Sequence, residues 1–184
     1  MNERPINVLL LEDSPTQAKT LMSWLAKVRG RGFTVEWVDQ IAKAFARLDA
    51  KDIDVILADL SVPDSRGLDT CLRLMVHAPA VPVVVLTGTF EDEALAIQAV
   101  QQGAQDYLFK EEADEKTLAR VLRYAIERKR VEQALKVSKL ELEEKVHELE
   151  TLNKIMLDRE ERILELKERV KVLEAQVATR GATA

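Results

Sequence analysis

Short apolar runs alternate with helical patterns over the first 112 residues of the chain. Three uninterrupted runs lie at residues 8–11, 55–58 and 83–86, and β-rich stretches lie at 33–38 and 107–109. Continuous apolar runs of this length are typical of strands that are buried on both faces, as in a parallel sheet covered by helices. The pattern therefore predicts five parallel strands.

Apolar residues return at helical spacing between these runs. Ser14 and Pro15 open the first helix, because serine caps a free N–H and proline has none to lose. Gly30 and Gly32 are expected to end that helix. Further helices are predicted at 41–48, after Gly67, at 92–102 with Gly103 as cap, and from 115 onward. Alternating strands and helices predict a five-stranded, doubly wound α/β fold.

Charged and polar side chains follow the ends of the predicted strands. Glu12 and Asp13 come after the first strand, Asp59 after the third, Thr87 after the fourth and Lys110 after the fifth. The carboxyl ends of parallel strands share one edge of the sheet, so we expect these side chains to converge there. Clustered carboxylates need a cation, and oxygen ligands suit Mg²⁺. A carboxylate can attack phosphorus to form an aspartyl phosphate, so this edge is predicted to accept phosphoryl groups.

Four motifs together resemble the receiver family of two-component response regulators over residues 5 to about 128. They are 11–14 (LEDS), 57–60 (LADL) with Pro63, Asp64 and Gly67, Thr87-Gly88, and 103–110 (GAQDYLFK). The resemblance implies a flavodoxin-like fold for a receiver domain at residues 1–126. It also implies a signalling phosphoacceptor rather than an enzyme, with a cognate histidine kinase or phosphotransfer protein as donor.

The resemblance assigns the metal ligands and the phosphoacceptor. Asp59 would accept the phosphoryl group. Asp13 and Asp59 would bind Mg²⁺ directly, with the backbone carbonyl of Ser61 as the third protein ligand. Glu12 would act on the metal through a water molecule.

The resemblance also assigns three residues to the response. Lys110 would pair with Asp59 and then with the phosphoryl group, Thr87 would be the switch hydroxyl, and Tyr107 would be the aromatic that turns inward with it. Many receivers carry proline after this lysine, whereas this chain carries Glu111. A cis bond is not expected there, because a non-proline cis bond costs roughly 3 kcal/mol.

Residues 113–180 contain neither proline nor glycine, which predicts one long helix over about 115–178. Its early apolar stripe should pack on the receiver domain: Leu118, Val121, Leu122, Ala125 and Ile126. Beyond it, apolar residues occupy every seventh position, called a: Leu135, Leu142, Leu149, Met156, Ile163, Val170 and Val177. The d positions are half apolar: Ser138, Lys145, Leu152, Arg159, Leu166 and Leu173. This heptad pattern predicts a coiled coil over 127–180 and a parallel homodimer.

The composition limits the binding partners and the cellular location that we expect for the protein. The net charge of -5 and the acids beside the basic run 128–130 argue against direct DNA binding. His147 is expected on the exposed face of the coil. Cys71 is the single cysteine, so no intrachain disulfide can form. No apolar run reaches the ~18 residues of a membrane span, and a cytoplasmic protein is expected.

Three functional hypotheses fit the sequence. The first is a stand-alone response regulator that signals through its coiled coil to an output protein. The second is a receiver-plus-linker piece of a larger hybrid kinase or enzyme, since heptads often join signalling modules. The third is a coiled-coil adaptor whose receiver domain is not switched. Phosphorylation of Asp59 distinguishes the third hypothesis from the first two.

Overall fold

The computed structural model describes residues 4–50, 52–88 and 93–181, with the side chains of Glu93 and of residues 172–181 outside the described part. We call the stripe of a and d positions the seam of the predicted coil. The helix start expected at Asp92 lies outside the described residues, and so do the seam side chains of Leu173 and Val177. The chain divides into two compact units, Met1–Gln133 and Ala134–Ala184.

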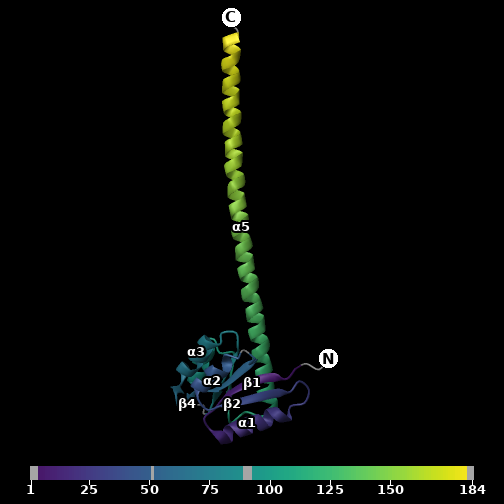
Figure 1. Cartoon of the computed structure of the whole chain (residues 1–184), viewed down its shortest axis with the longest axis vertical. Helices are drawn as coiled ribbons and strands as arrows, with labels where there is room; N and C mark the ends of the chain where they lie inside the picture. Colours follow the sequence, from purple (N-terminus) through teal and green to yellow (C-terminus); the bar gives the residue numbers. More distant parts are fainter. Residues whose placement is uncertain (1–3, 51, 89–92, 182–184) are drawn as a thin grey trace. The chain divides into compact units, whose positions relative to one another are not determined.

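The first unit contains a five-stranded sheet with the order β2-β1-β3-β6-β7, in which every neighbouring pair is parallel (Figure 1). Its strands are β1 (Ile6–Leu11), β2 (Phe33–Val38), β3 (Val55–Asp59), β6 (Val83–Thr87) and β7 (Asp106–Phe109). The helices are α1 (Pro15–Lys27), α2 (Ile41–Leu48), α3 (Leu68–His77), α4 (Glu93–Gln101) and α5 (Glu115–Gly181). The predicted parallel α/β fold is confirmed.

Strand β1 shows why its apolar run is continuous. Successive side chains point to opposite faces of the sheet, so Leu9 and Leu11 enter one core while Val8 and Leu10 enter the other. The first core packs residues of α2, α3 and α4, and the second packs residues of α1 and the start of α5. The predicted stripe of α5 lies in this second core, where Leu118, Leu122 and Ala125 are buried and Val121 and Ile126 are partly buried.

Helix α1 begins as predicted and ends earlier than predicted. The Ser14 side chain accepts the N–H of Gln17, with Pro15 as the first helical residue. The helix ends at Lys27, because Val28 is already extended, so Gly30 lies in the following loop with φ of 91°. The glycines therefore turn the chain toward β2 and do not cap the helix.

A two-stranded antiparallel hairpin, which the apolar pattern did not predict, directly follows β3. Strand β4 (Ser61–Val62) pairs with β5 (Ser65–Arg66). In the turn between them, the carboxylate of Asp64 accepts the N–H groups of Ile41 at 2.9 Å and Ala42 at 3.0 Å. Asp64 thus caps α2, whose own N-cap residue Gln40 makes no side-chain hydrogen bond.

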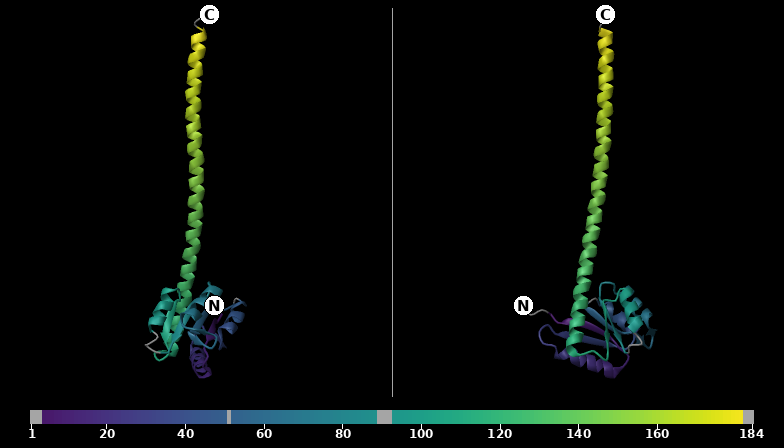
Figure 2. Two further views of the ribbon diagram at one scale, coloured as in Figure 1. Left: turned by 90° about the vertical axis from the view of Figure 1, so that its left-hand side faces the viewer. Right: turned by 180° about the vertical axis from the view of Figure 1, so that it is seen from behind.

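The second unit is the continuation of α5 (Figure 2). Its a-position side chains are 41% to 69% exposed in the single chain between Leu135 and Val170. His147 is exposed in the single chain, as is every other described side chain of this unit, so its position on the outer face of the coil stays a prediction. Among the described residues, no helix is long and apolar enough to cross a membrane.

Candidate functional site

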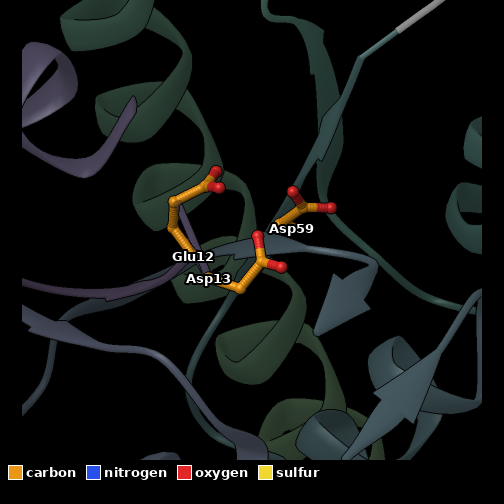
Figure 3. A group of neighbouring side chains, drawn as sticks. All are labelled: Glu12, Asp13 and Asp59. Carbon is orange, nitrogen blue, oxygen red and sulfur yellow. The ribbon is translucent and has the colours of Figure 1, made fainter. Parts of the chain in front are cut away.

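Three carboxylates meet at the carboxyl edge of the sheet. Glu12 and Asp13 follow β1, and Asp59 ends β3, its direct neighbour in the sheet. One oxygen of each residue lies within 4.8 Å of the others, and Figure 3 shows the three carboxylates turned toward a common space. Glu12 is buried, Asp59 is half-buried and Asp13 is exposed. Hard oxygen donors at this spacing are the ligands that Mg²⁺ prefers, so the residues present fit that ion.

Glu12 is held in place from two sides. Its Oε1 atom accepts the N–H of Ser14 at 3.1 Å, and its backbone carbonyl accepts the indole N–H of Trp37 at 2.7 Å. Burial raises the pKa of Glu12, and proximity to Asp59 adds to that, while Lys110 and the Ser14 N–H oppose it without cancelling it. Burial disfavours the ionised form of this carboxyl, and a nearby cation would stabilise that form.

Lys110 supplies that positive charge. Its Nζ atom lies 2.5 Å from Asp59 Oδ2, 2.5 Å from Gln17 Oε1 and 2.8 Å from Glu12 Oε2. The contact with Glu12 is an ion pair that lacks hydrogen-bond alignment. Burial has the largest influence on the pKa of Lys110 and lowers it, but Asp59 and Glu12 together outweigh burial and raise the pKa. The ammonium therefore donates hydrogen bonds to Asp59 and Gln17 and forms an ion pair with Glu12.

Asp59 receives a second donor on its other oxygen. Its Oδ1 atom accepts the backbone N–H of Ser61 at 2.9 Å, while Oδ2 faces Lys110. The two donors hold both oxygens of Asp59 in fixed positions, and a carboxylate oxygen is the nucleophile in the formation of an aspartyl phosphate. The role of the Ser61 carbonyl as a metal ligand stays a prediction.

The two predicted switch residues lie on adjacent strands. Thr87 ends β6 and is 4% exposed, and its carbonyl accepts the N–H of Lys110 at 2.8 Å. Tyr107 on β7 is half-buried, with its ring edge-on to Phe109 at 5.5 Å between centroids. The strand end thus connects Lys110 to Thr87 through the backbone. The switching roles of Thr87 and Tyr107 stay predictions.

Two contributors to the site were not predicted from the sequence. Gln17 in the first turns of α1 contacts Lys110, and Trp37 on β2 holds the loop that carries Glu12. Neither residue belongs to a motif, and each reaches the site only through the spatial neighbourhood of α1 and β2. The peptide bond after Lys110 is not cis, as expected, since the described residues contain no cis bond.

Comparison with known proteins identifies the family. The family model of the response regulator receiver domain matches residues 8–123, and the chain belongs to this family. A receiver is a signalling domain, and its partners in the family are histidine kinases or phosphotransfer proteins.

Individual relatives cover the same region. The swarming motility regulation protein RssB of Serratia marcescens is 32% identical over 116 residues, which are 63% of this chain and 51% of the relative. The cell cycle transcriptional regulator CtrA of Caulobacter vibrioides is 30% identical over 116 residues, 63% of this chain and 48% of the relative. The chain therefore matches about half the length of these curated relatives.

A solved structure is similar in both sequence and fold. It is a response regulator from Burkholderia pseudomallei with a phosphorylated aspartic acid, a calcium ion and citrate. It is 29% identical, covers 71% of this chain and 74% of its own, and has a TM-score of 0.56.

Proposed function

We propose that this protein is a response regulator that accepts a phosphoryl group on Asp59 in a Mg²⁺-dependent reaction, with a histidine kinase or phosphotransfer protein as donor. The observation that carries the proposal is the position of Lys110 Nζ, 2.5 Å from Asp59 Oδ2 and 2.8 Å from Glu12 Oε2. A cation between two carboxylates, beside a third, suits a site in which negative charge accumulates during phosphoryl transfer.

The chemistry follows from these groups. An oxygen of Asp59 attacks phosphorus and a P–O bond forms. The P–N bond of a phosphohistidine breaks with its electron pair passing to nitrogen, and the ring leaves as neutral imidazole because its other nitrogen carries a proton. Lys110 and the Ser61 N–H donate to the two carboxylate oxygens of Asp59 and so orient the acceptor. Mg²⁺, held by Asp13, Asp59 and the Ser61 carbonyl, with Glu12 acting through a water, would supply further neutralisation of phosphoryl charge.

The response to phosphorylation would pass through the end of β6. The Thr87 hydroxyl can donate a hydrogen bond to a phosphoryl oxygen on the neighbouring strand end. Because Thr87 and Tyr107 lie on adjacent strands, a shift of the hydroxyl would change the space open to the ring. The proposal therefore puts the output of the switch on the β6–β7 side of the sheet.

The second unit supports a proposal of dimerisation. Apolar side chains at successive a positions are largely exposed in the single chain, for example Leu135 at 69%, Leu142 at 63% and Leu149 at 65%. A helix with such a regular apolar seam is normally covered by a second helix. We therefore propose that the protein forms a homodimer through this seam and signals to its output partner in that form.

One observation favours a second candidate. RssB and CtrA are each about twice as long as the region they share with this chain. The receiver and helix would then be one segment of a larger hybrid kinase or enzyme, with the same phosphoacceptor at Asp59. The two candidates differ in what the helix is attached to, which the length of the native polypeptide on a denaturing gel decides.

Phosphotransfer from phosphoramidate, a small P–N donor, tests the proposed function. The protein should gain one phosphoryl group in Mg²⁺ and none in EDTA, and Asp59→Asn should remain unlabelled. Asp158→Asn, the same change at an exposed position of the coil, is the matched control and should label normally. Equal labelling of Asp59→Asn would reject Asp59 as the acceptor.

A further inference from the structure

The polar residues in the seam of the second unit are distributed unevenly. Every described a position from Leu135 to Val170 is apolar, whereas the d positions include two cations, Lys145 and Arg159. All these side chains are exposed in the single chain. The cost of burying the two cations therefore depends on which residues a second helix places against them.

A parallel, in-register pair places each seam residue against its own copy. Lys145 would then face the partner's Lys145, and Arg159 would face the partner's Arg159. The residue before each a position, called g, and the residue after each d position, called e, flank the seam. In a parallel pair, Arg162 at g would lie beside the partner's Lys167 at e. Three levels of the coil would thus hold like charges in contact, and like charges at partly buried positions are strongly unfavourable.

An antiparallel pair removes these clashes, because each d residue then faces an a residue of the other helix. Since every described a position is apolar, neither cation can meet a cation in the seam. In the register that places Leu149 against the partner's Leu152, Lys145 faces Met156 and Arg159 faces Leu142 of the second copy. A lysine or arginine stem can pack on such a neighbour while its charged end reaches water.

The flanking charges point the same way. In an antiparallel pair, g positions of one helix lie beside g positions of the other. The early g positions are acids, Glu141 and Glu148, and the late ones are bases, Arg162 and Arg169. Reversing one helix therefore places acids beside bases, either in the register above or in the one shifted by a heptad. In a parallel pair the two acids would face only Val146 and Asn153.

We infer that a second copy of this chain packs antiparallel along the helix of the second unit. The inference rests on the proposed dimerisation and replaces the parallel direction predicted from the a positions alone. The a positions establish that a seam exists, but direction is set by the residues that interrupt the seam at d and flank it at g.

Engineered disulfides test the direction. Native Cys71 is fully buried, and burial raises the pKa of its thiol to about 11, so it stays unreactive in the folded protein. Leu142→Cys alone should not form a covalent dimer, because antiparallel copies place the two cysteines about 25 Å apart or more. Mixed with Arg159→Cys or with Leu166→Cys chains, it should form a covalent heterodimer with one of them.

The outcomes separate the inference from the proposed function. A rapid disulfide between two Leu142→Cys chains would overturn the antiparallel direction while leaving the dimer intact. A full-length protein that sediments as a monomer, or as a trimer, would overturn both the inference and the proposed dimer. Phosphorylation of Asp59 is measured separately and does not depend on either result.

A charge exchange provides an independent test. Replacing Glu141 and Glu148 by Arg should weaken the dimer roughly tenfold, because bases then face bases. Adding Arg162→Glu and Arg169→Glu to the same chain should restore the affinity. An affinity that the first two changes leave unaltered would contradict the antiparallel arrangement.

Discussion

The ammonium of Lys110 lies 2.5 Å from Oδ2 of Asp59, which joins the loop after β7 to the end of β3 across the intervening strand β6. The two residues are 51 positions apart in the chain. The same ammonium reaches Glu12 after β1, so three strand ends meet at one charge. This contact makes the lysine the first residue to test for the proposed phosphorylation chemistry.

Replacing Lys110 by alanine should slow phosphorylation from a small donor by roughly a hundredfold, since it removes a preorganised charge beside the acceptor. Lys110→Arg should retain part of the rate. Lys136→Ala, on the exposed surface of α5, is the matched control and should react like the wild type. Initial rates of phosphoryl incorporation provide the measurement, and a wild-type rate in Lys110→Ala would remove the lysine from the mechanism.

Asp13 and Glu12 should contribute differently to the Mg²⁺ affinity of the site. Asp13→Ala should weaken Mg²⁺ binding at least tenfold, because it removes a proposed direct carboxylate ligand. Glu12→Gln should weaken it less, because Glu12 is proposed to act through a water. Mg²⁺ titration followed by tryptophan fluorescence in a Trp24→Phe background measures both, because Trp37 is then the single tryptophan and its indole N–H donates to the Glu12 carbonyl. Equal loss in the two variants would mean that their roles are not divided in this way.

Glu12 should make the metal-free protein less stable as the pH rises. Its pKa is raised in the folded state above the ordinary 4.5, chiefly by burial, so the folded protein holds this proton more tightly than the unfolded chain does. The free energy of unfolding should therefore fall as pH rises from about 4.5 through the raised pKa. Denaturant unfolding in EDTA should show this fall in the wild type and a smaller one in Glu12→Gln, and identical pH profiles would contradict it.

The cap that Asp64 places on α2 should contribute measurable stability. Asp64→Ala should lower the free energy of unfolding by about 1 kcal/mol, because the N–H groups of Ile41 and Ala42 lose their acceptor. Burial tends to raise the pKa of Asp64, yet these two bonds hold it below the ordinary 3.8. The contribution should thus persist above pH 3.8 and vanish as the pH falls through the lowered value.

A control isolates this effect. Asp69→Ala removes an exposed acid from the first turn of α3, which among the described residues has only a long ion pair to Arg73 at 3.7 Å and a long hydrogen bond from the Ser65 hydroxyl at 3.4 Å. It should cost less than Asp64→Ala in the same denaturant titration. If both changes cost the same, the hydrogen bonds to α2 contribute nothing beyond ordinary surface charge.

The seam of the second unit should determine assembly. Leu149→Asp with Leu152→Asp places two charges per chain at the middle of the coil, where desolvation is costly, and should raise the dimer dissociation constant at least a hundredfold. Leu157→Asp with Leu164→Asp changes two equally exposed leucines outside the seam and should leave the dimer intact. Sedimentation equilibrium compares the pairs, and a dimer that survives the first change would place the interface elsewhere.

The fold could be predicted because its signals are long and regular. Three apolar runs became β1, β3 and β6, and the helical pattern of residues 41–48 became α2 with the same limits. The convergence of Glu12, Asp13 and Asp59 followed from one rule, that the carboxyl ends of parallel strands share an edge. Both predictions depend on the spacing of apolar residues and on the order of strands and helices, and the sequence shows these directly.

The parts of the fold and of the site that were not predicted depend on contacts between residues far apart in the sequence, and such contacts follow no repeating pattern. The β4–β5 hairpin has two-residue strands, too short for an alternating pattern, and the cap from Asp64 joins residues 22 or more positions apart. Gln17 and Trp37 enter the site because α1 and β2 lie beside it, which no local pattern encodes. The parallel direction predicted for the coil used only the a positions, and the charges at d and g lead to the opposite inference.

The central claim is that Asp59 accepts a phosphoryl group, and intact-protein mass spectrometry tests it most directly. After incubation with acetyl phosphate and Mg²⁺, the wild type should gain the mass of one phosphoryl group, lose it on mild alkaline hydrolysis, and gain none when EDTA is present. Asp59→Asn should gain nothing under the same conditions. A phosphoryl adduct of equal extent on Asp59→Asn, or its absence from the wild type in saturating Mg²⁺, would contradict the account.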